Sequence, residues 1–401
     1  MSGPLEGTLV LDLSRVLAGP WASQTLADLG ARVIKVERPG QGDDTRSWGP
    51  PWLGEGDKRE SAYYLSANRG KESIAIDFKD PRGQAVILKL AAKADILIEN
   101  YKPGGLIAYG LDYASVSRVN PAIVYCSISG FGQTGPYAKK PGYDFMIQAM
   151  SGLMSVTGTE KPTKVGVAVS DLVTGLYAAT GILAALTRAR ATGQGEWVDV
   201  SLLDAQLAAL ANQGMNYLVT GASPGLAGNA HPNIVPYQVF ESRDDPFVVA
   251  VGNDRQFIAL CRAIGRDDLA SDKRFVSNAG RVENREVLVP ALAEVFRQHP
   301  AAHWLDVFER HGIPAAPVNT IAAAFSDPHV MERQTVMTSV REGLGSVPGV
   351  RSPVRFRHNV PDEVNAPPAL GGSTRRVLRE IGLTGEEIET LFNEAVAAGP
   401  G

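Results

Sequence analysis

Short runs of apolar and β-branched residues alternate with stretches of helical periodicity along the first half of the chain, and this alternation restricts the fold most. A helical stretch over residues 22–29 ends at Gly30, and another begins with Asp80 as N-cap and Pro81 at the first helical position. Strands that alternate with helices form parallel sheets. We therefore predict a Rossmann-like α/β fold. The predicted strands cover residues 8–13, 32–37, 73–78, 95–99 and 122–127.

The chain has 401 residues, which is enough for two or three domains. Residues 202–218 have the length and periodicity of one long helix. Residues 221–236 are rich in Gly, Pro, Ser and Asn and are typical of a long connection. A segment with its own strand and helices follows, so we expect a second, smaller α+β domain. The predicted boundaries are a large domain of residues 1–200 and 325–401, a linker of residues 201–236 and a small domain of residues 237–317.

The C-terminal stretch, residues 373–397, has helical spacing. Thr384 and Glu387 are three residues apart, just before Ile388. This spacing predicts a capping box at the start of a helix.

Charge and cysteine content exclude several classes of protein. The 39 Lys and Arg residues against 43 Asp and Glu residues give a net charge of −4, which provides no field to hold nucleic acid or an anionic membrane. Cys126 and Cys261 are too few for a disulfide framework or a four-cysteine zinc site. Asp171 interrupts the most hydrophobic region, so no run of about 18 apolar residues predicts a membrane span. We expect a cytoplasmic protein that meets any anionic ligand in a local basic pocket.

Two further motifs carry weak signals. Residues 130–135, Gly-Phe-Gly-Gln-Thr-Gly, match a dinucleotide fingerprint, but Pro136 and the lysines after it do not open a helix, so we interpret them as a flexible turn. His299 and His303 are spaced i, i+4 without a third ligand nearby in sequence. We interpret them as surface histidines and predict no metal site.

Asp171 is the most informative single residue. It interrupts an apolar stretch that continues as residues 176–186, so its carboxylate is expected to be buried or half-buried. Desolvation raises the pKa of such a carboxylate, whereas backbone donors at a helix start lower it. The pattern leaves two roles open: a structural N-cap at a strand-to-helix step, or a reactive carboxylate.

Eight segments, taken in order along the chain, resemble the class III CoA-transferase family. The likeness runs nearly from end to end. It implies open-ring protomers, each with a large Rossmann-like domain and a smaller domain, that interlock as a homodimer. The segments are residues 15–20, 30–40, 42–46, 100–104, 141–144, 165–175, 228–233 and 312–318.

The resemblance implies that Asp171 is the nucleophile. In this family the aspartate attacks an acyl-CoA thioester and passes through an aspartyl-CoA thioester before a carboxylic acid acceptor takes the CoA. CoA thioesters are substrates, and no metal or redox cofactor is permanently bound. The oxyanions of this chemistry need backbone N–H donors, for which the glycine turns are candidates.

The family pattern also implies a set of CoA-binding residues. Taken alone, each lysine or arginine among them is an ordinary solvated surface charge. The chain departs from the family pattern at one position that affects binding of the CoA phosphates. Ala108 stands where formyl-CoA transferase has a CoA-contacting arginine, and Lys102 is a candidate substitute. The implied residues are Leu17, Ala18, Arg38, Ile76, Lys79, Asn100, Tyr101, Lys102, Lys140 and Tyr143.

The identities of residues 143 and 144 distinguish a CoA-transferase from a related acyl-CoA racemase. Related racemases carry an acid/base histidine at the position of Tyr143, and a tyrosine with a reference pKa near 10 replaces it poorly. Asp144 is interpreted as an orienting carboxylate. An acyl-CoA racemase or isomerase and a non-catalytic CoA-binding protein remain the alternatives to a transferase.

Within the family, the chain is most similar to the type that moves CoA from succinyl-CoA to glutarate. Leu17 replaces a glutamine of formyl-CoA transferase, which argues against formate and oxalate as substrates. A dicarboxylate needs a cation for its distal carboxylate, and Arg46 is the predicted clamp. The alternative is a structural Arg46 that pairs with Asp43 or Asp44. Further predicted substrate residues are Trp48, Tyr63 and His231.

Overall fold

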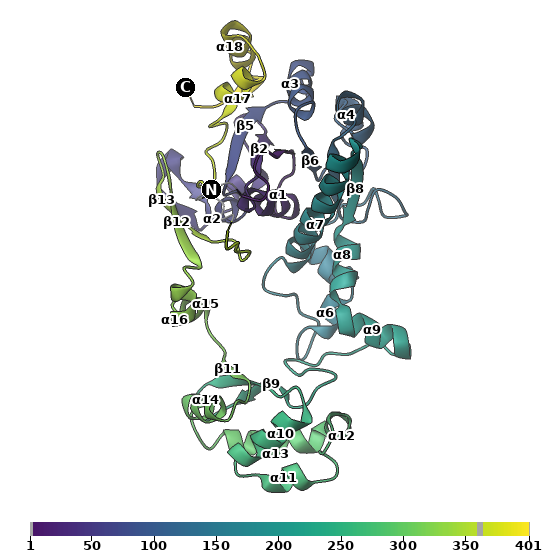
Figure 1. Ribbon diagram of the computed structural model, residues 1–401, viewed down its shortest axis with the longest axis vertical. Coiled ribbons are helices and arrows are strands. Elements are labelled where there is room, and N and C mark those ends of the chain that lie inside the picture. Colours follow the sequence, from purple (N-terminus) through teal and green to yellow (C-terminus); the bar gives the residue numbers. More distant parts are fainter. Residues whose placement is uncertain (1–2, 359–363, 401) are drawn as a thin grey trace. The chain divides into compact units, whose positions relative to one another are not determined.

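The computed structural model describes residues 3–358 and 364–400. The chain divides into two compact units, each with its own core (Figure 1). Residues 201–219, expected in a linker, belong to the first unit. The first unit comprises Met1–Leu153, Val165–Val219 and Met331–Gly401, and the second comprises Met154–Lys164 and Thr220–Val330.

A seven-stranded sheet forms the centre of the first unit, in the order β14-β5-β2-β1-β6-β7-β8. All neighbouring strands are parallel except the short β14, which runs antiparallel to β5. The six parallel strands, numbered along the chain, follow the order 3-2-1-4-5-6 of doubly wound sheets. The predicted mostly parallel α/β sheet is therefore confirmed. The strands are β1 (Leu9–Asp12), β2 (Arg32–Glu37), β5 (Lys71–Ile76), β6 (Ile96–Glu99), β7 (Val124–Ser129), β8 (Glu196–Ser201) and β14 (Ala397–Ala398).

Both faces of the sheet are covered, which explains why its strands are nearly continuous apolar runs. Neighbouring residues of β1 point to opposite faces: Leu11 lies in the core beneath one set of helices and Val10 in the core beneath the other. The helices are α3 (Pro81–Ala91), α4 (Tyr113–Val119), α17 (Thr374–Glu380) and α18 (Gly385–Asn393) on one face, and α1 (Ala18–Asp28) and α7 (Val169–Thr192) on the other.

Several helices begin or end at the residues that the sequence signals predict. Asp80 caps α3 by accepting the N–H of Arg82, and Gly30 follows α1 with a φ of 99°. The capping box of Thr384 and Glu387 is present at the start of α18. The expected helix over residues 373–397 is instead two helices, because Gly382 adopts a φ of 89° between them.

The prediction of one continuous helix over residues 202–218 is also wrong, because this stretch forms two helices. It divides into α8 (Leu202–Ala209) and α9 (Ala211–Thr220). Ala211 adopts a φ of 46°, a left-handed conformation that interrupts helical hydrogen bonding. Only α8 has buried residues, so core packing determines α8 and does not extend to α9.

The second unit contains a three-stranded antiparallel sheet in the order β11-β10-β9. Its helices pack on that sheet around Phe247, Phe296 and Phe308. The unit therefore has an α+β core of its own. Its elements are β9 (Tyr237–Glu241), β10 (Pro246–Ala250), β11 (Ala315–Pro317), α10 (Asp254–Ala263), α11 (Asp267–Ser271), α12 (Asn278–Glu283), α13 (Arg285–Phe296), α14 (Ala301–Arg310) and α15 (Ile321–Phe325). Helix α16 (Pro328–Glu332) includes the boundary at which the chain returns to the first unit.

Short elements connect the larger ones. They are η1 (Asp44–Ser47), β3 (Trp52–Leu53), η2 (Gly56–Lys58), β4 (Glu60–Ser61), α2 (Ala62–Ser66), η3 (Ile107–Tyr109), α5 (Asp144–Met150), α6 (Leu153–Val156), β12 (Val336–Arg341) and β13 (Gly345–Val350).

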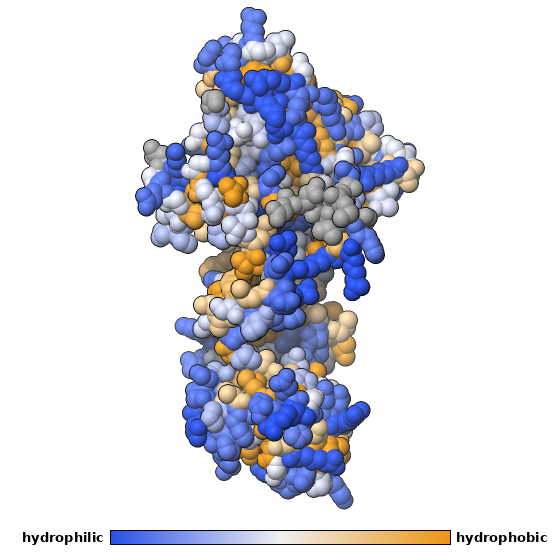
Figure 2. Space-filling model, turned by 60° about the vertical axis from the view of Figure 1, so that its left-hand side comes forward, coloured by the Kyte–Doolittle hydropathy of each residue, from blue (hydrophilic) through white to orange (hydrophobic). Residues whose placement is uncertain are grey.

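Among the described residues, α7 alone has the length and apolar composition of a membrane-spanning helix. One side of it packs in the core through Ala178, Ile182 and Leu186, which is how the central helix of a soluble domain behaves. Leu176 and Tyr177, on its other side, are about half exposed. Hydrophobic side chains also lie among hydrophilic ones elsewhere on the surface (Figure 2).

Candidate active site

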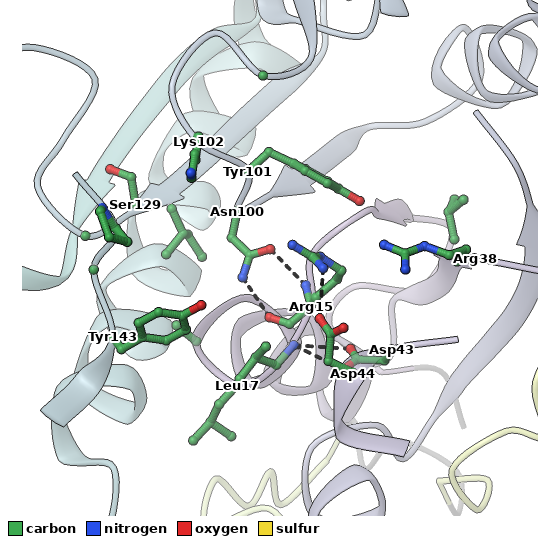
Figure 3. Close-up of a pocket in the computed structure, with 18 of the residues that line it drawn as sticks. Arg15, Leu17, Arg38, Asp43, Asp44, Asn100, Tyr101, Lys102, Ser129 and Tyr143 are labelled. Carbon is green, nitrogen blue, oxygen red and sulfur yellow. Dashed lines mark hydrogen bonds and ion pairs between the residues drawn. The ribbon is translucent and has the colours of Figure 1, made fainter. Parts of the chain in front are cut away.

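A cavity of about 730 Å³ opens at the carboxyl ends of the parallel strands in the first unit. Its walls come from the segments that directly follow β1, β2, β5, β6 and β7 (Figure 3). Strand order reverses between β1 and β6, and ligands of doubly wound sheets bind beside this switch point. The position of the cavity is therefore that of a ligand site.

The cavity brings together most of the site residues that the sequence predicts. The predicted nucleophile Asp171 and the predicted substrate residue Trp48 both line it. Gly130 and Gly142 form another part of the wall, where their backbones approach so closely that a Cβ on either would collide with the other. No helix follows the turn of residues 130–135 directly, since α5 begins at Asp144, so the turn is not a dinucleotide fingerprint. The predicted CoA-binding residues Leu17, Ala18, Arg38, Ile76, Lys79, Asn100, Tyr101, Lys102, Lys140 and Tyr143 all line the cavity.

The loop between β1 and α1 forms the centre of the cavity floor and is held in a strained conformation. Val16 has a φ of 70°, which is unfavourable for a β-branched residue. Its N–H donates to both carboxylate oxygens of Asp43 at 3.2 Å. Asn100 accepts the N–H of Arg15 at 2.9 Å and donates to its carbonyl at 2.7 Å (Figure 3). The loop geometry is therefore fixed by side chains from two other segments.

Buried ion pairs lie beneath this loop. Lys35 Nζ lies 2.9 Å from Asp43 Oδ2, and both side chains are fully buried. Burial opposes ionisation of Asp43, but the Lys35 charge and the hydrogen bonds from Lys35 and Thr45 together outweigh it, so the pKa of the carboxyl is lowered to about 2. Lys71 and Asp12 form a second buried pair, 3.2 Å apart. Removing one partner of such a pair leaves an uncompensated charge, so these residues support the loop as a unit.

Asp171 lies in the first turn of α7, two residues inside the helix start. The cap comes from Asp144 instead, whose Oδ1 accepts the N–H groups of Ser170 at 2.8 Å and Asp171 at 3.4 Å. The N-cap alternative for Asp171 is therefore wrong. Burial, and then the nearby Asp144 charge, raise the pKa of Asp171 to about 7. Such a carboxylate, poorly solvated and without a cation beside it, is poised to react.

Tyr63, on α2, is close to the same carboxylate although it does not line the cavity. Its ring meets Trp48 edge to face, with centroids 5.2 Å apart. Burial, then the charges of Asp171, Asp144 and Asp43, raise the pKa of Tyr63 to about 12. The phenol therefore keeps its proton at neutral pH and serves as a hydrogen-bond donor.

Arg46 is the clearest error of the sequence prediction. Its guanidinium donates to Glu37 at 2.8 Å, to Glu60 at 2.7 Å and to the Tyr64 hydroxyl at 2.6 Å, and its side chain is only 9% exposed. It neither lines the cavity nor pairs with Asp43 or Asp44, the partners in the structural alternative. Its donors are consumed by a buried network, so the predicted role as a substrate clamp does not hold.

His231 and Ala108 also lie outside the cavity wall. His231 belongs to the second unit, where its ring lies 5.3 Å from the Tyr237 ring and Nδ1 accepts the N–H of Asn233. Ala108 is exposed on η3, whereas Lys102 lines the cavity.

In the described part of the chain, no group of three or more His, Cys, Asp or Glu side chains is arranged to hold a metal ion. The rings of His299 and His303 stack on each other, 4.2 Å apart.

Arg15, Phe78, Tyr109 and Ser129 are among the lining residues that were not singled out from the sequence. Phe78 contacts Tyr109 edge to face, at 5.3 Å, and forms an apolar wall with it. Arg15, Phe78 and Ser129 lie at or just beyond a strand end, and that position is the signal by which the sequence could have identified them.

Comparison with known proteins identifies relatives of this chain. The family model described as CoA-transferase family III matches residues 5–374. A succinate–glutarate CoA-transferase of Agrobacterium fabrum is 46% identical over 94% of this chain and 96% of its own. The human succinyl-CoA:glutarate CoA-transferase is 45% identical over 94% of this chain and 86% of its own. The crystal structure of a CAIB/BAIF family protein from Brucella suis superposes with a TM-score of 0.83, at 45% identity, and covers 95% of this chain and 100% of its own.

Proposed function

The chain belongs to CoA-transferase family III, and on this premise we propose that it transfers CoA from succinyl-CoA to a short dicarboxylic acid such as glutarate. The observation that carries the proposal is the half-buried Asp171 carboxyl, with its raised pKa, in a cavity lined by all ten predicted CoA-binding residues. We also propose a cytoplasmic enzyme that binds no permanent cofactor. Free, buried Cys126 and Cys261 agree with a reducing compartment.

Asp171 is the proposed nucleophile. Its carboxylate oxygen attacks the thioester carbonyl, the C–S bond breaks, and the products are a mixed anhydride and CoA thiolate. The thiolate then attacks the aspartyl carbonyl, which releases succinate and leaves an aspartyl-CoA thioester. The acceptor carboxylate repeats both steps in the opposite sense, so Asp171 is regenerated with no net proton change. Covalent catalysis divides one difficult transfer into easier steps.

The tetrahedral intermediates need donors for their oxyanions, and the start of α1 supplies candidates. Leu17 and Ala18 line the cavity, and the first turn of α1 has no side-chain cap. The N–H groups of such a turn are left to bind an anion. We assign them the oxyanion role in preference to the glycine turns, because the rigid loop before α1 fixes their direction.

The remaining parts of the cavity fit the rest of the two substrates. Phe78 and Tyr109 offer adenine an apolar wall. Tyr63 and Trp48, beside Asp171, are proposed to contact the acceptor acid, with the protonated Tyr63 phenol donating to its carboxylate. Leu17 narrows the same region with an apolar side chain, which favours a carbon chain over formate.

The proposal is tested by incubating the protein with succinyl-CoA and glutarate and separating the CoA esters by chromatography. Glutaryl-CoA is the expected product. A panel of other dicarboxylates determines the preferred chain length, since one methylene changes selectivity by only about 1–3 kcal/mol. Absence of transfer, together with deuterium uptake at the α-carbon of an acyl-CoA, would support the racemase alternative instead.

Asp144→Asn is expected to shift the pH dependence of transfer. The nucleophile must be ionised, so kcat/KM should rise with pH through about 7, the pKa of Asp171. The amide in Asp144→Asn keeps an oxygen to accept the Ser170 N–H but carries no negative charge, so the pKa of Asp171 falls and the acid limb moves to lower pH. A pH–rate profile of both proteins measures the shift. An unmoved or upward-shifted limb would contradict the assignment of that limb to Asp171.

We propose that two copies interlock as a homodimer, with residues 195–235 and 310–330 wrapped around the partner. Apolar side chains in these segments support it: Leu218, Val219 and Ile321 are 73%, 75% and 78% exposed. We expect a dimer that does not dissociate on dilution without unfolding. Sedimentation at nanomolar concentration checks this, and a folded monomer under those conditions would refute the proposal.

A further inference from the structure

We propose that Arg15 binds a phosphate group of CoA and that Asp44 is the counter-ion it gives up when CoA enters. This inference rests on the proposed function and adds to the cavity a cation that the family pattern did not assign.

The side chain of Arg15 lines the cavity but is incompletely satisfied by protein. Its Nη1 lies 2.8 Å from Asp44 Oδ2, and the two side chains are 35% and 42% exposed. Within residues 3–358 and 364–400, its Nε is buried with no hydrogen-bond partner. Asn100 holds the N–H and carbonyl of Arg15, so a rigid loop presents the guanidinium (Figure 3). The group therefore resembles a preformed anion site with a weak occupant.

Arg15 lies at the same end of the cavity as Arg38. The charges of Arg15, Lys35 and Arg38 all counteract the burial that raises the pKa of Tyr101. The Arg15 guanidinium lies 5.2 Å from the Tyr101 ring centre, and Figure 3 shows both arginines near that ring. Lys35 is committed to the buried Asp43, so of these three cations the two arginines are available to a ligand.

The anion at this end is a phosphate rather than the distal carboxylate of the acyl group. Burial and Asp144 account for the raised pKa of Asp171, with no contribution from Arg15 or another cation. In a succinyl group, the distal carboxylate lies only about 4 Å from the reacting carbon, so a cation that holds it would also act on Asp171. The pantetheine arm separates the phosphates of CoA from the thioester, so a cation that binds a phosphate does not act on Asp171, in agreement with the absence of an Arg15 contribution to the pKa of Asp171.

Asp44 is suited to be displaced. Half-exposed ion pairs contribute little to stability, so exchanging this carboxylate for a doubly charged phosphate costs little. Asp44 also begins η1, beside the buried Asp43, and remains in place after Arg15 turns to the ligand. The same carboxylate that holds Arg15 ready in the free enzyme competes with CoA for it.

The test is the kinetics of Arg15→Gln, Asp44→Asn and the double variant. Arg15→Gln should raise the KM for succinyl-CoA roughly 10- to 100-fold, the effect of one charged hydrogen bond, while the KM for glutarate stays unchanged. Asp44→Asn should lower the KM for succinyl-CoA a few-fold, and the double variant should lose that gain. Arg82→Gln is the matched control, since Arg82 pairs with Asp80 away from the cavity and should leave both KM values unchanged.

Two further measurements separate the possible outcomes. The succinyl thioester of dephospho-CoA identifies the group: a penalty for Arg15→Gln that disappears indicates the 3′-phosphate, and one that persists indicates the diphosphate. Calorimetric binding of free CoA tests the inference without turnover. If CoA binds wild type at least tenfold more tightly than Arg15→Gln although no transfer occurs, the inference stands and the proposed function fails. If transfer occurs but Arg15→Gln, with a normal melting temperature, changes neither CoA affinity nor the KM for succinyl-CoA, the inference is overturned.

Discussion

Asp171→Asn is expected to abolish transfer of CoA from succinyl-CoA to glutarate, with a loss in kcat of at least about 10⁴-fold. The amide has almost the shape of the carboxylate but cannot attack a thioester or carry CoA. Chromatography should show no glutaryl-CoA, and mass spectrometry of wild type incubated with succinyl-CoA should show a covalent CoA adduct that the variant lacks. Asp171→Ala should behave in the same way.

The variant should also be more stable than wild type in a defined pH range. The pKa of Asp171 is about 7 in the folded protein against an ordinary value of 3.8, so ionising it disfavours the folded state. The gain of Asp171→Asn in free energy of unfolding should grow from about pH 4 to pH 7 and stay constant above. A stable variant that still forms glutaryl-CoA would exclude Asp171 as the nucleophile, whereas an unfolded one would be replaced by Asp171→Ala.

Arg46→Ala is expected to be the most destabilising substitution among those considered. It leaves Glu37 and Glu60, both buried, without the cation that they share. Breaking a buried pair costs about 3–5 kcal/mol, which is a large fraction of the stability of most domains. Arg46→Lys keeps the charge but loses the two-pronged contact with Glu37, so it should lose less. Urea unfolding measures both.

Arg38→Ala is the matched control for Arg46→Ala. Arg38 is exposed in the cavity and its side chain bonds only to Gln41 among the described contacts, so the variant should keep the stability of wild type and show a raised KM for succinyl-CoA. If Arg46→Ala instead kept the stability of wild type and raised only the KM for glutarate, the buried network would be unimportant for stability. The predicted role of Arg46 as a substrate clamp would then be supported.

The sequence predicted the parallel sheet and the cavity wall well because both depend on local signals. β2 was predicted with its exact bounds, and β1, β5, β6 and β7 within about two residues, since buried parallel strands are continuous apolar runs bounded by turns. Most of the predicted CoA-binding residues follow strand ends, and their motifs resemble a known family. These signals lie within a few residues of each other along the chain.

The errors arise where contacts join distant segments or where packing overrides periodicity. The acidic partners of Arg46 are Glu37 and Glu60, nine and fourteen residues away, whereas the adjacent Asp43 turns to Lys35 and Val16. No glycine or proline marks the break at Ala211, so a periodic pattern continues through it. A sequence pattern alone carries no information about which of several acidic residues a buried arginine reaches.

The strained loop at Val16 has a consequence for the thermodynamics of binding. Its backbone is already ordered by Asp43 and Asn100, in a conformation that an unsupported valine rarely adopts. The loss of conformational entropy on ordering this loop therefore occurs during folding, and the loop needs little further ordering when CoA binds. The association of CoA should then draw its favourable free energy from contacts, with little of it offset by immobilising the chain around the thioester.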